Sequence, residues 1–231
     1  MTMVCGPKLA LPPDAVYPWL EEFRRLGHKN LQQAVDESIQ VVQALAEPEG
    51  HYQLMPVGLR SNTVALSDDL AIPSGWLAGK LAGAQQVAVV VVSLGSELSV
   101  RVERTLQWDP LTGRVQQLVA QVALNRWSEQ MWRSLGQTYA PNYNQLTPFL
   151  QPGSADFPRH IIPELLGLVP SASRSVRLGR SGELKPPLSA LALVGLGQDV
   201  AWSIGGHNCD VCGYFDCFLR QFKYGSGSTW Q

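Results

Sequence analysis

Three of the four cysteines of the chain lie close together near its C-terminus, at Cys209, Cys212 and Cys217. Two thiolates separated by two residues can bind one soft metal ion, because the short turn between them aims both sulfurs at a common point. Cys217 and His207 could complete a set of four ligands, tetrahedral for zinc or around an iron–sulfur cluster. Reduced, partly buried thiols and a disulfide are also compatible with this grouping. The pattern therefore predicts soft-metal or thiol chemistry here and leaves these alternatives open.

Other residue types that carry chemistry show no catalytic pattern. His28, His51 and His160 have no nucleophile or acidic partner at an interpretable spacing, so we interpret them as structural or surface residues. Gly195 and Gly197 follow an apolar segment, but no third glycine completes a dinucleotide-binding loop. The sequence therefore assigns no catalytic residue.

The composition is typical of a compact protein that binds neither polyanions nor membranes. The 231 residues are 45% hydrophobic and 16% charged, with a formal net charge of −1. No basic stripe could neutralise many phosphates, so no nucleic-acid partner is expected. No apolar run reaches the roughly 20 residues of a membrane span, and no export signal is visible. Clustered cysteines fit a reducing compartment, so we expect a cytoplasmic protein with no membrane partner.

Periodic apolar patterns predict the elements that must position these residues. The longest helical pattern runs from about Arg114 to Leu135 and is expected to form the backbone of the core, with Gly136 closing it. Further helices are predicted at 14–26, 31–45, 75–81, 96–106 and about 158–166. Strands are predicted at 87–93, 176–178 and 191–196. With no internal repeat and no linker, these elements predict a single α+β domain.

Four short motifs follow one another in a fixed order. They are Pro141-Asn142-Tyr143, Asp156-Phe157-Pro158, Pro186-Pro187-Leu188-Ser189 running into Leu193-Val194-Gly195-Leu196-Gly197, and Cys209, Cys212, Cys217 with Arg220. Together with the apolar segment that ends in Leu94-Gly95, they resemble the reactivation domain of cobalamin-dependent methionine synthase, particularly its stand-alone relatives in anaerobic bacteria. The resemblance covers roughly residues 65 to 222.

This resemblance implies a fold and a division of the chain. The expected fold class is α+β, with a central antiparallel sheet flanked by helices. Residues 1–64 would form an N-terminal helical extension packed on the core, residues 65–222 the activation-domain-like core, and residues 223–231 a flexible tail. The whole would be one compact domain.

The resemblance also implies a function related to methyl transfer. The domain would bind S-adenosylmethionine and assist the reductive methylation of cobalamin, or another corrinoid, on a partner protein or a methionine synthase fragment. Pro141, Asn142, Tyr143 and Ser189 would contact S-adenosylmethionine. Whether the domain is itself a methyltransferase-type enzyme is left open.

The chain also departs from the pattern of this family. Thr138 stands where the family motif Arg-x-x-x-Gly-Tyr has arginine, and Asn142 stands where it has glycine. Twelve extra residues, 144–155, follow, and Arg180-Ser181-Gly182 replaces a Glu-Ser-Tyr segment. Two alternatives therefore stay open. One is a non-enzymatic accessory or interaction module of the same fold, and the other is a small protein whose cysteines bind a metal or an iron–sulfur cluster.

Overall fold

A five-stranded antiparallel sheet forms the centre of the molecule. The computed structural model describes residues 2–5, 9–20, 31–139 and 145–200. The strand order is β1-β2-β6-β10-β7, and every neighbouring pair is antiparallel. The strands are β1 (Thr2–Cys5), β2 (Glu49–Pro56), β6 (Gln86–Ser93), β7 (Gln145–Leu146) and β10 (Ser189–Gly197). The fold class predicted from the sequence is thereby confirmed.

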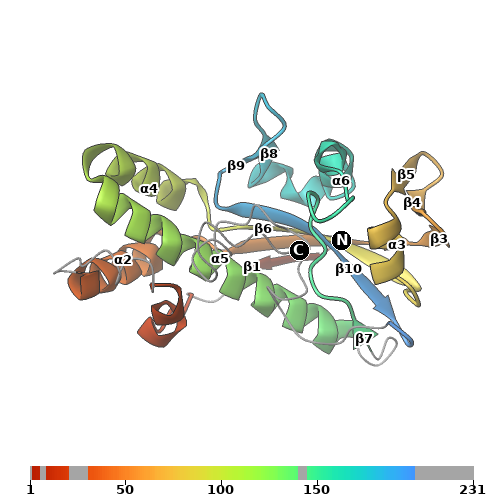
Figure 1. Ribbon diagram of the computed structural model, residues 1–231, viewed down its shortest axis with the longest axis horizontal. Helices are drawn as coiled ribbons and strands as arrows, with labels where there is room; N and C mark the ends of the chain where they lie inside the picture. The colour runs from red at the N-terminus through yellow and green to blue at the C-terminus, as the bar shows by residue number, and fades with distance from the viewer. Residues whose placement is uncertain (1, 6–8, 21–30, 140–144, 201–231) are drawn as a thin grey trace, which may run out of the picture.

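Helices cover one face of this sheet, and α5 runs along its length (Figure 1). The helices are α2 (Leu31–Leu45), α4 (Ser96–Trp108) and α5 (Pro110–Tyr139). Side chains alternate between the two faces of a strand, so Ala88, Val90 and Val92 of β6 face these helices. They share one buried core with Trp127 and Met131 of α5.

Smaller elements cover the opposite face. They are α3 (Gly75–Lys80), α6 (Ile162–Gly167), the 3₁₀ turns Arg159–Ile161 and Pro170–Arg174, and a small sheet of β3 (Gly58–Arg60), β4 (Thr63–Ser67) and β5 (Leu70–Pro73). Val87, Val89 and Val91 of β6 pack against this layer. The hairpin of β8 (Arg177–Leu178) and β9 (Leu184–Lys185) projects beyond it (Figure 1). Two further 3₁₀ turns, Pro13–Ala15 and Tyr17–Trp19, precede α2. They replace the start of the helix predicted at 14–26, whose residues 21–26 lie outside the described ones.

The structure confirms most of the predicted elements and corrects the end of the longest helix. The helix at 31–45 and the strands at 87–93 and 191–196 lie where the sequence predicts them. Gly136 was expected to end the long helix, and that prediction is wrong, because α5 continues to Tyr139. A helix accepts an interior glycine at a cost of only about 1 kcal/mol, which neighbouring turns can offset.

The first 64 residues contribute strands as well as a helix. The sequence patterns did not reveal β1 or β2, yet β2 lies inside the sheet, between β1 and β6. The division of the chain into an extension over 1–64 and a core over 65–222 stays a prediction. Among the helices that the structure describes, none combines the length and the apolar character needed to traverse a bilayer.

The helices α4 and α5 form a tight pair next to the sheet. Gly113, near the start of α5, is buried against Leu106 of α4. A Cβ atom at Gly113 would lie 2.5 Å from both the Cα and the backbone nitrogen of Leu106. Because backbone atoms cannot move aside as a flexible side chain can, this position requires glycine for the observed helix separation.

Two glycines of α5 therefore make a matched pair for a test. We expect Gly113→Ala to lower the free energy of unfolding by about 1–3 kcal/mol, because the methyl group forces α4 and α5 apart. Gly136→Ala, where a Cβ would meet nothing within 4 Å, should instead raise it by about 0.5–1 kcal/mol through helix propensity. Urea unfolding followed by circular dichroism measures both. A stabilising Gly113→Ala would contradict the close crossing of the two helices.

Candidate functional site

A row of polar residues crosses the sheet at one end. Glu49 on β2 pairs with Ser93 on β6, and Ser93 pairs with Ser189 on β10. The hydroxyl of Ser189 is half-buried and donates a hydrogen bond to Ser93 Oγ at 3.0 Å. Ser93 Oγ also accepts a hydrogen bond of 3.1 Å from the backbone N–H of Gly95. Ser189, a predicted ligand contact, thus lies in a polar network whose hydroxyl groups retain free lone pairs.

The turn that follows β6 holds this end of the sheet together. Gly95 has a φ of +85°, a conformation that glycine adopts at no steric cost. The backbone N–H of Leu94 donates to the carbonyl of Leu188 at 2.9 Å, and the carbonyl of Leu94 accepts from Glu47 N–H at 3.0 Å. Ser99 Oγ donates to the carbonyl of Gly95 at 3.2 Å. The end of α2, the end of β6 and the start of β10 are therefore fixed to one turn.

His51 on β2 is buried beside this row. It is 3% exposed, and its Nε2 lies 3.1 Å from Ser175 Oγ and 3.6 Å from Glu49 Oε2. Its Nδ1 is buried without a hydrogen-bond partner in the described part of the chain. A Ser–His–acid relay needs the hydroxyl and the carboxylate on opposite ring nitrogens, whereas here both lie near the same one. This arrangement does not support nucleophilic catalysis.

The Asp-Phe-Pro motif has a structural role that its sequence does not reveal. Asp156 accepts hydrogen bonds from Ser74 Oγ and from the backbone N–H groups of Gly75 (2.9 Å) and Trp76 (3.2 Å). These are the first N–H groups of α3, and Ser74 Oγ in turn accepts from Leu77 N–H at 3.0 Å. Phe157 is buried in the core on the same side of the sheet. The motif therefore caps α3 and anchors the loop that precedes α6.

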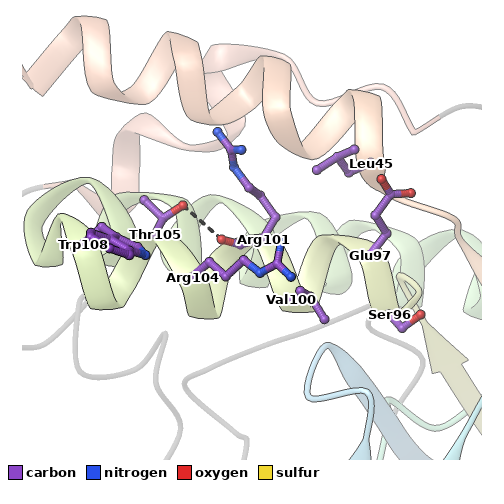
Figure 2. A pocket seen from close by; sticks show the side chains of 8 residues that line it. All are labelled: Leu45, Ser96, Glu97, Val100, Arg101, Arg104, Thr105 and Trp108. Atoms are coloured by element: carbon purple, nitrogen blue, oxygen red, sulfur yellow. Dashed lines mark hydrogen bonds between the residues drawn. The ribbon is translucent and has the colours of Figure 1, made fainter.

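Two grooves of about 630 Å³ each open on the surface of the described residues. One lies between the end of α2 and α4 and is lined by Leu45, Ser96, Glu97, Val100, Arg101, Arg104, Thr105 and Trp108 (Figure 2). The other lies between α6 and the β8–β9 hairpin and is lined by Pro152, Arg159, His160, Ile162, Pro163, Ser181, Gly182 and Glu183. Ser189 lines neither groove.

Most of the predicted site residues lie outside the described residues. These are Pro141, Asn142, Tyr143, His207, Cys209, Cys212 and Cys217. Within the residues that the structure covers, no group of three or more His, Cys, Asp or Glu side chains could hold a metal ion. The predicted metal ligands thus stay a prediction.

Tyr139 and Gln145 are the described residues on each side of the segment 140–144. Tyr139 Oη lies 3.2 Å from Tyr52 Oη, and the two rings meet edge to face with centroids 6.2 Å apart. Gln145 pairs with Gly197, at the opposite end of β10 from Ser189. At about 3.3 Å per residue, those two ends are roughly 26 Å apart. Ser189 is therefore not placed beside Gln145, and its grouping with Tyr143 stays a prediction.

The architecture is that of an α+β domain in which a five-stranded antiparallel sheet has helices on both faces. No protein-family model matches the chain, and no curated protein matches it. Among solved structures, the chain is similar to the MetH reactivation domain in its crystal structure bound to AdoHcy. The TM-score is 0.60 over 87% of this chain and 79% of that chain, with 14% sequence identity. The protein therefore has the fold of the MetH reactivation domain, as its motifs predicted.

The cap on α3 gives a prediction for stability and its pH dependence. The hydrogen bond from Ser74, followed by those from Trp76 and Gly75, lowers the pKa of Asp156 below its ordinary value. A carboxylate with a lowered pKa stabilises the folded state above its unfolded pKa of about 3.9, and this stabilisation is lost as the pH falls through the folded pKa. We expect Asp156→Ala to lower the free energy of unfolding by about 1 kcal/mol at pH 7.

Urea unfolding at pH 7 and near pH 3 measures this effect. The difference between wild type and Asp156→Ala should shrink at the lower pH, because protonation removes the same interaction. Asp69→Asn, at an exposed aspartate between β4 and β5, is the control. It should leave the free energy of unfolding unchanged at both pH values. A difference that grows as the pH falls would contradict the capping role.

Proposed function

We propose that this protein binds S-adenosylmethionine and assists the reductive methylation of a corrinoid carried by a partner protein. The observation that carries the proposal is the fold shared over 87% of the chain with a domain whose structure contains AdoHcy. AdoHcy is what remains of S-adenosylmethionine once its methyl group has been transferred. The reaction would consume S-adenosylmethionine and one electron from a separate reductant, and it would yield AdoHcy and the methylated corrinoid.

The sulfonium of S-adenosylmethionine is bound by an aromatic surface and carbonyl groups and does not require a catalytic base. Tyr143 is our candidate for the aromatic surface, with Pro141 and Asn142 shaping its loop. Ser189 is a further candidate, since its hydroxyl donates to Ser93 and keeps its acceptor capacity. No general acid or base is required of this chain, in agreement with the absence of a catalytic pattern in the sequence.

Ligand binding can be tested by thermal unfolding. A ligand that binds only the folded state at one hundred times its Kd adds about 2.7 kcal/mol of stability. For a chain of this size, that corresponds to a rise in Tm of about 5–10 °C. We expect this rise with S-adenosylmethionine and with AdoHcy, and no rise with methionine at the same concentration. Differential scanning fluorimetry measures it.

The aromatic contact has its own matched control. Tyr143→Ala should weaken binding of S-adenosylmethionine by about 1–2 kcal/mol, or roughly five- to thirty-fold, because the sulfonium loses its cation–π partner. Tyr143→Phe keeps the ring and should bind like the wild type. Isothermal titration calorimetry gives the Kd values. Equal affinities for Tyr143→Ala and wild type would remove Tyr143 from the site.

One observation favours the second candidate function, an accessory module that keeps the fold without the ligand. Thr138, which stands where the related motif has arginine, donates its hydroxyl to the carbonyl of Ser134 at 2.8 Å. Its side chain thus bonds to its own helix and offers no cation to a carboxylate or a ribose. The absence of any Tm rise with S-adenosylmethionine would support this alternative.

We also propose that Cys209, Cys212, Cys217 and His207 bind zinc or an iron–sulfur cluster. Protein purified without oxygen should then contain close to one equivalent of zinc, or iron with the visible absorption of a cluster. Cys212→Ser should lose this metal, whereas Cys5→Ser, in β1 and outside the motif, should retain it. Elemental mass spectrometry measures the metal content of the wild type and of both variants. Four titratable thiols and no metal in the wild type would contradict the proposal.

A further inference from the structure

Two of the large apolar side chains that are exposed in the described part of the chain line the same groove. These two are Val100 (44% exposed) and Trp108 (87%) on α4. A third exposed residue, Leu111 (39%), follows at the start of α5. Scattered single apolar residues are ordinary on a protein surface, whereas a grouped set is typical of an interaction site. Tryptophan is also among the residues that most often dominate binding energies at protein interfaces. This grouping singles out the outer side of α4.

Cations lie on the same side of α4. Glu97, Arg101, Arg104 and Trp108 line the groove and recur at steps of four, three and four residues, which places them in one stripe along the helix (Figure 2). Both arginines are exposed. Neither guanidinium group has an ion pair or a hydrogen bond with any residue that the structure describes. The Thr105 hydroxyl, which also lines the groove, donates a hydrogen bond to the Arg101 carbonyl at 2.9 Å.

The groove therefore has a charge polarity along its length. A carboxylate lies at the N-terminal end of α4, and an exposed indole lies at its C-terminal end (Figure 2). Between them lie two guanidinium groups that have no partner among the described residues. Arginine and tryptophan together suit a partner that brings carboxylates next to an apolar side chain, since guanidinium groups form paired hydrogen bonds with carboxylates. The 13 residues of α4 extend about 20 Å, which matches a partner segment of about three helical turns.

We propose that this α4 surface, made of Val100, Arg101, Arg104 and Trp108, docks an acidic segment of a partner protein that carries an apolar anchor residue. The carboxylates pair with Arg101 and Arg104, and the anchor packs on Trp108 and Val100. A surface of a few side chains on one helix is smaller than a standard protein–protein interface. Interfaces below the standard size are typically weak and transient, so micromolar affinity is expected. The inference does not depend on the binding of S-adenosylmethionine, because the candidate contact Ser189 is not among the residues that line the groove.

A labelled peptide tests the proposal on the full chain. The probe is a fluorescein-labelled 12-residue peptide of glutamate and leucine at helical spacing, compared with peptides in which lysine or glutamine replaces every glutamate. Fluorescence anisotropy at low salt should show saturable binding of the acidic peptide alone. Its affinity should fall by about tenfold or more between 50 and 500 mM salt, because the exposed charges are screened.

Variants decide whether the binding occurs at this surface. The double variant Arg101→Gln with Arg104→Gln, and Trp108→Ala separately, should each weaken binding at least about tenfold. Arg60→Gln, which removes an exposed cation from β3, is the matched control and should bind like the wild type. Because all the altered side chains are exposed, circular dichroism and Tm should stay unchanged.

Three outcomes would overturn the proposal. The first is equal binding of the acidic and lysine peptides, and the second is unchanged affinity in the double arginine variant. The third is a homodimer, detected by analytical ultracentrifugation without peptide, that Trp108→Ala dissociates, since the occupant would then be a second copy of the chain. The thermal test with S-adenosylmethionine, run on the same wild-type protein, separates failure of the proposed function from failure of this inference.

Discussion

Burial of β6 on both of its faces is the constraint on which the remaining structure depends. Its alternate side chains enter two different cores, one under α2, α4 and α5 and the other under α3, α6 and the small sheet. Its two edges are hydrogen-bonded to β2 and β10. A strand enclosed in this way must be apolar throughout, which explains the unbroken run from Val87 to Val92. The two layers of helices can pack only because this strand offers each of them an apolar surface.

The same strand determines where polar chemistry can occur. The apolar run ends at Ser93, and there the chain changes to hydroxyl groups, the Leu94–Gly95 turn and the start of α4. Ser189 reaches this position because β10 runs antiparallel to β6, so that its first residue lies beside the last residue of β6. The groove on α4 continues from this end of the sheet through Ser96 and Glu97. Polar groups thus gather where the central strand leaves the core.

Sequence patterns predicted the elements whose signals are local. The α2 stripe and the valine run are visible in single windows of sequence, and both were placed correctly. β2 was missed because its residues, Glu49 to Pro56, include Gly50, His51 and Gln53 and lack the alternation typical of a strand. Its burial depends on neighbours, since Met131 of α5 fills the space above Gly50. Packing contacts of this kind, between residues far apart in the chain, cannot be recognised in a short window of sequence.

In the candidate site, too, the features that depend on tertiary neighbours could not be predicted from the sequence. The role of Asp156 at the start of α3 joins residues about 80 positions apart, so no spacing rule could reveal it. The guanidinium groups of Arg101 and Arg104 become informative only when the structure shows that no described residue pairs with them. The motif resemblance, by contrast, predicted the fold correctly at 14% identity to the solved domain.

The position of β6 in the sheet also has a consequence for the synthesis of the chain. β6 pairs with β10 across 96 to 110 residues, from Ser93–Ser189 to Gln86–Leu196. On the ribosome, this valine-rich segment emerges long before its partner strand, with one edge open and no proline or charge to protect it. Such a segment is a template for intermolecular pairing until β10 arrives. The strand that holds the finished domain together therefore exposes an unpaired edge in the nascent chain until β10 has been made.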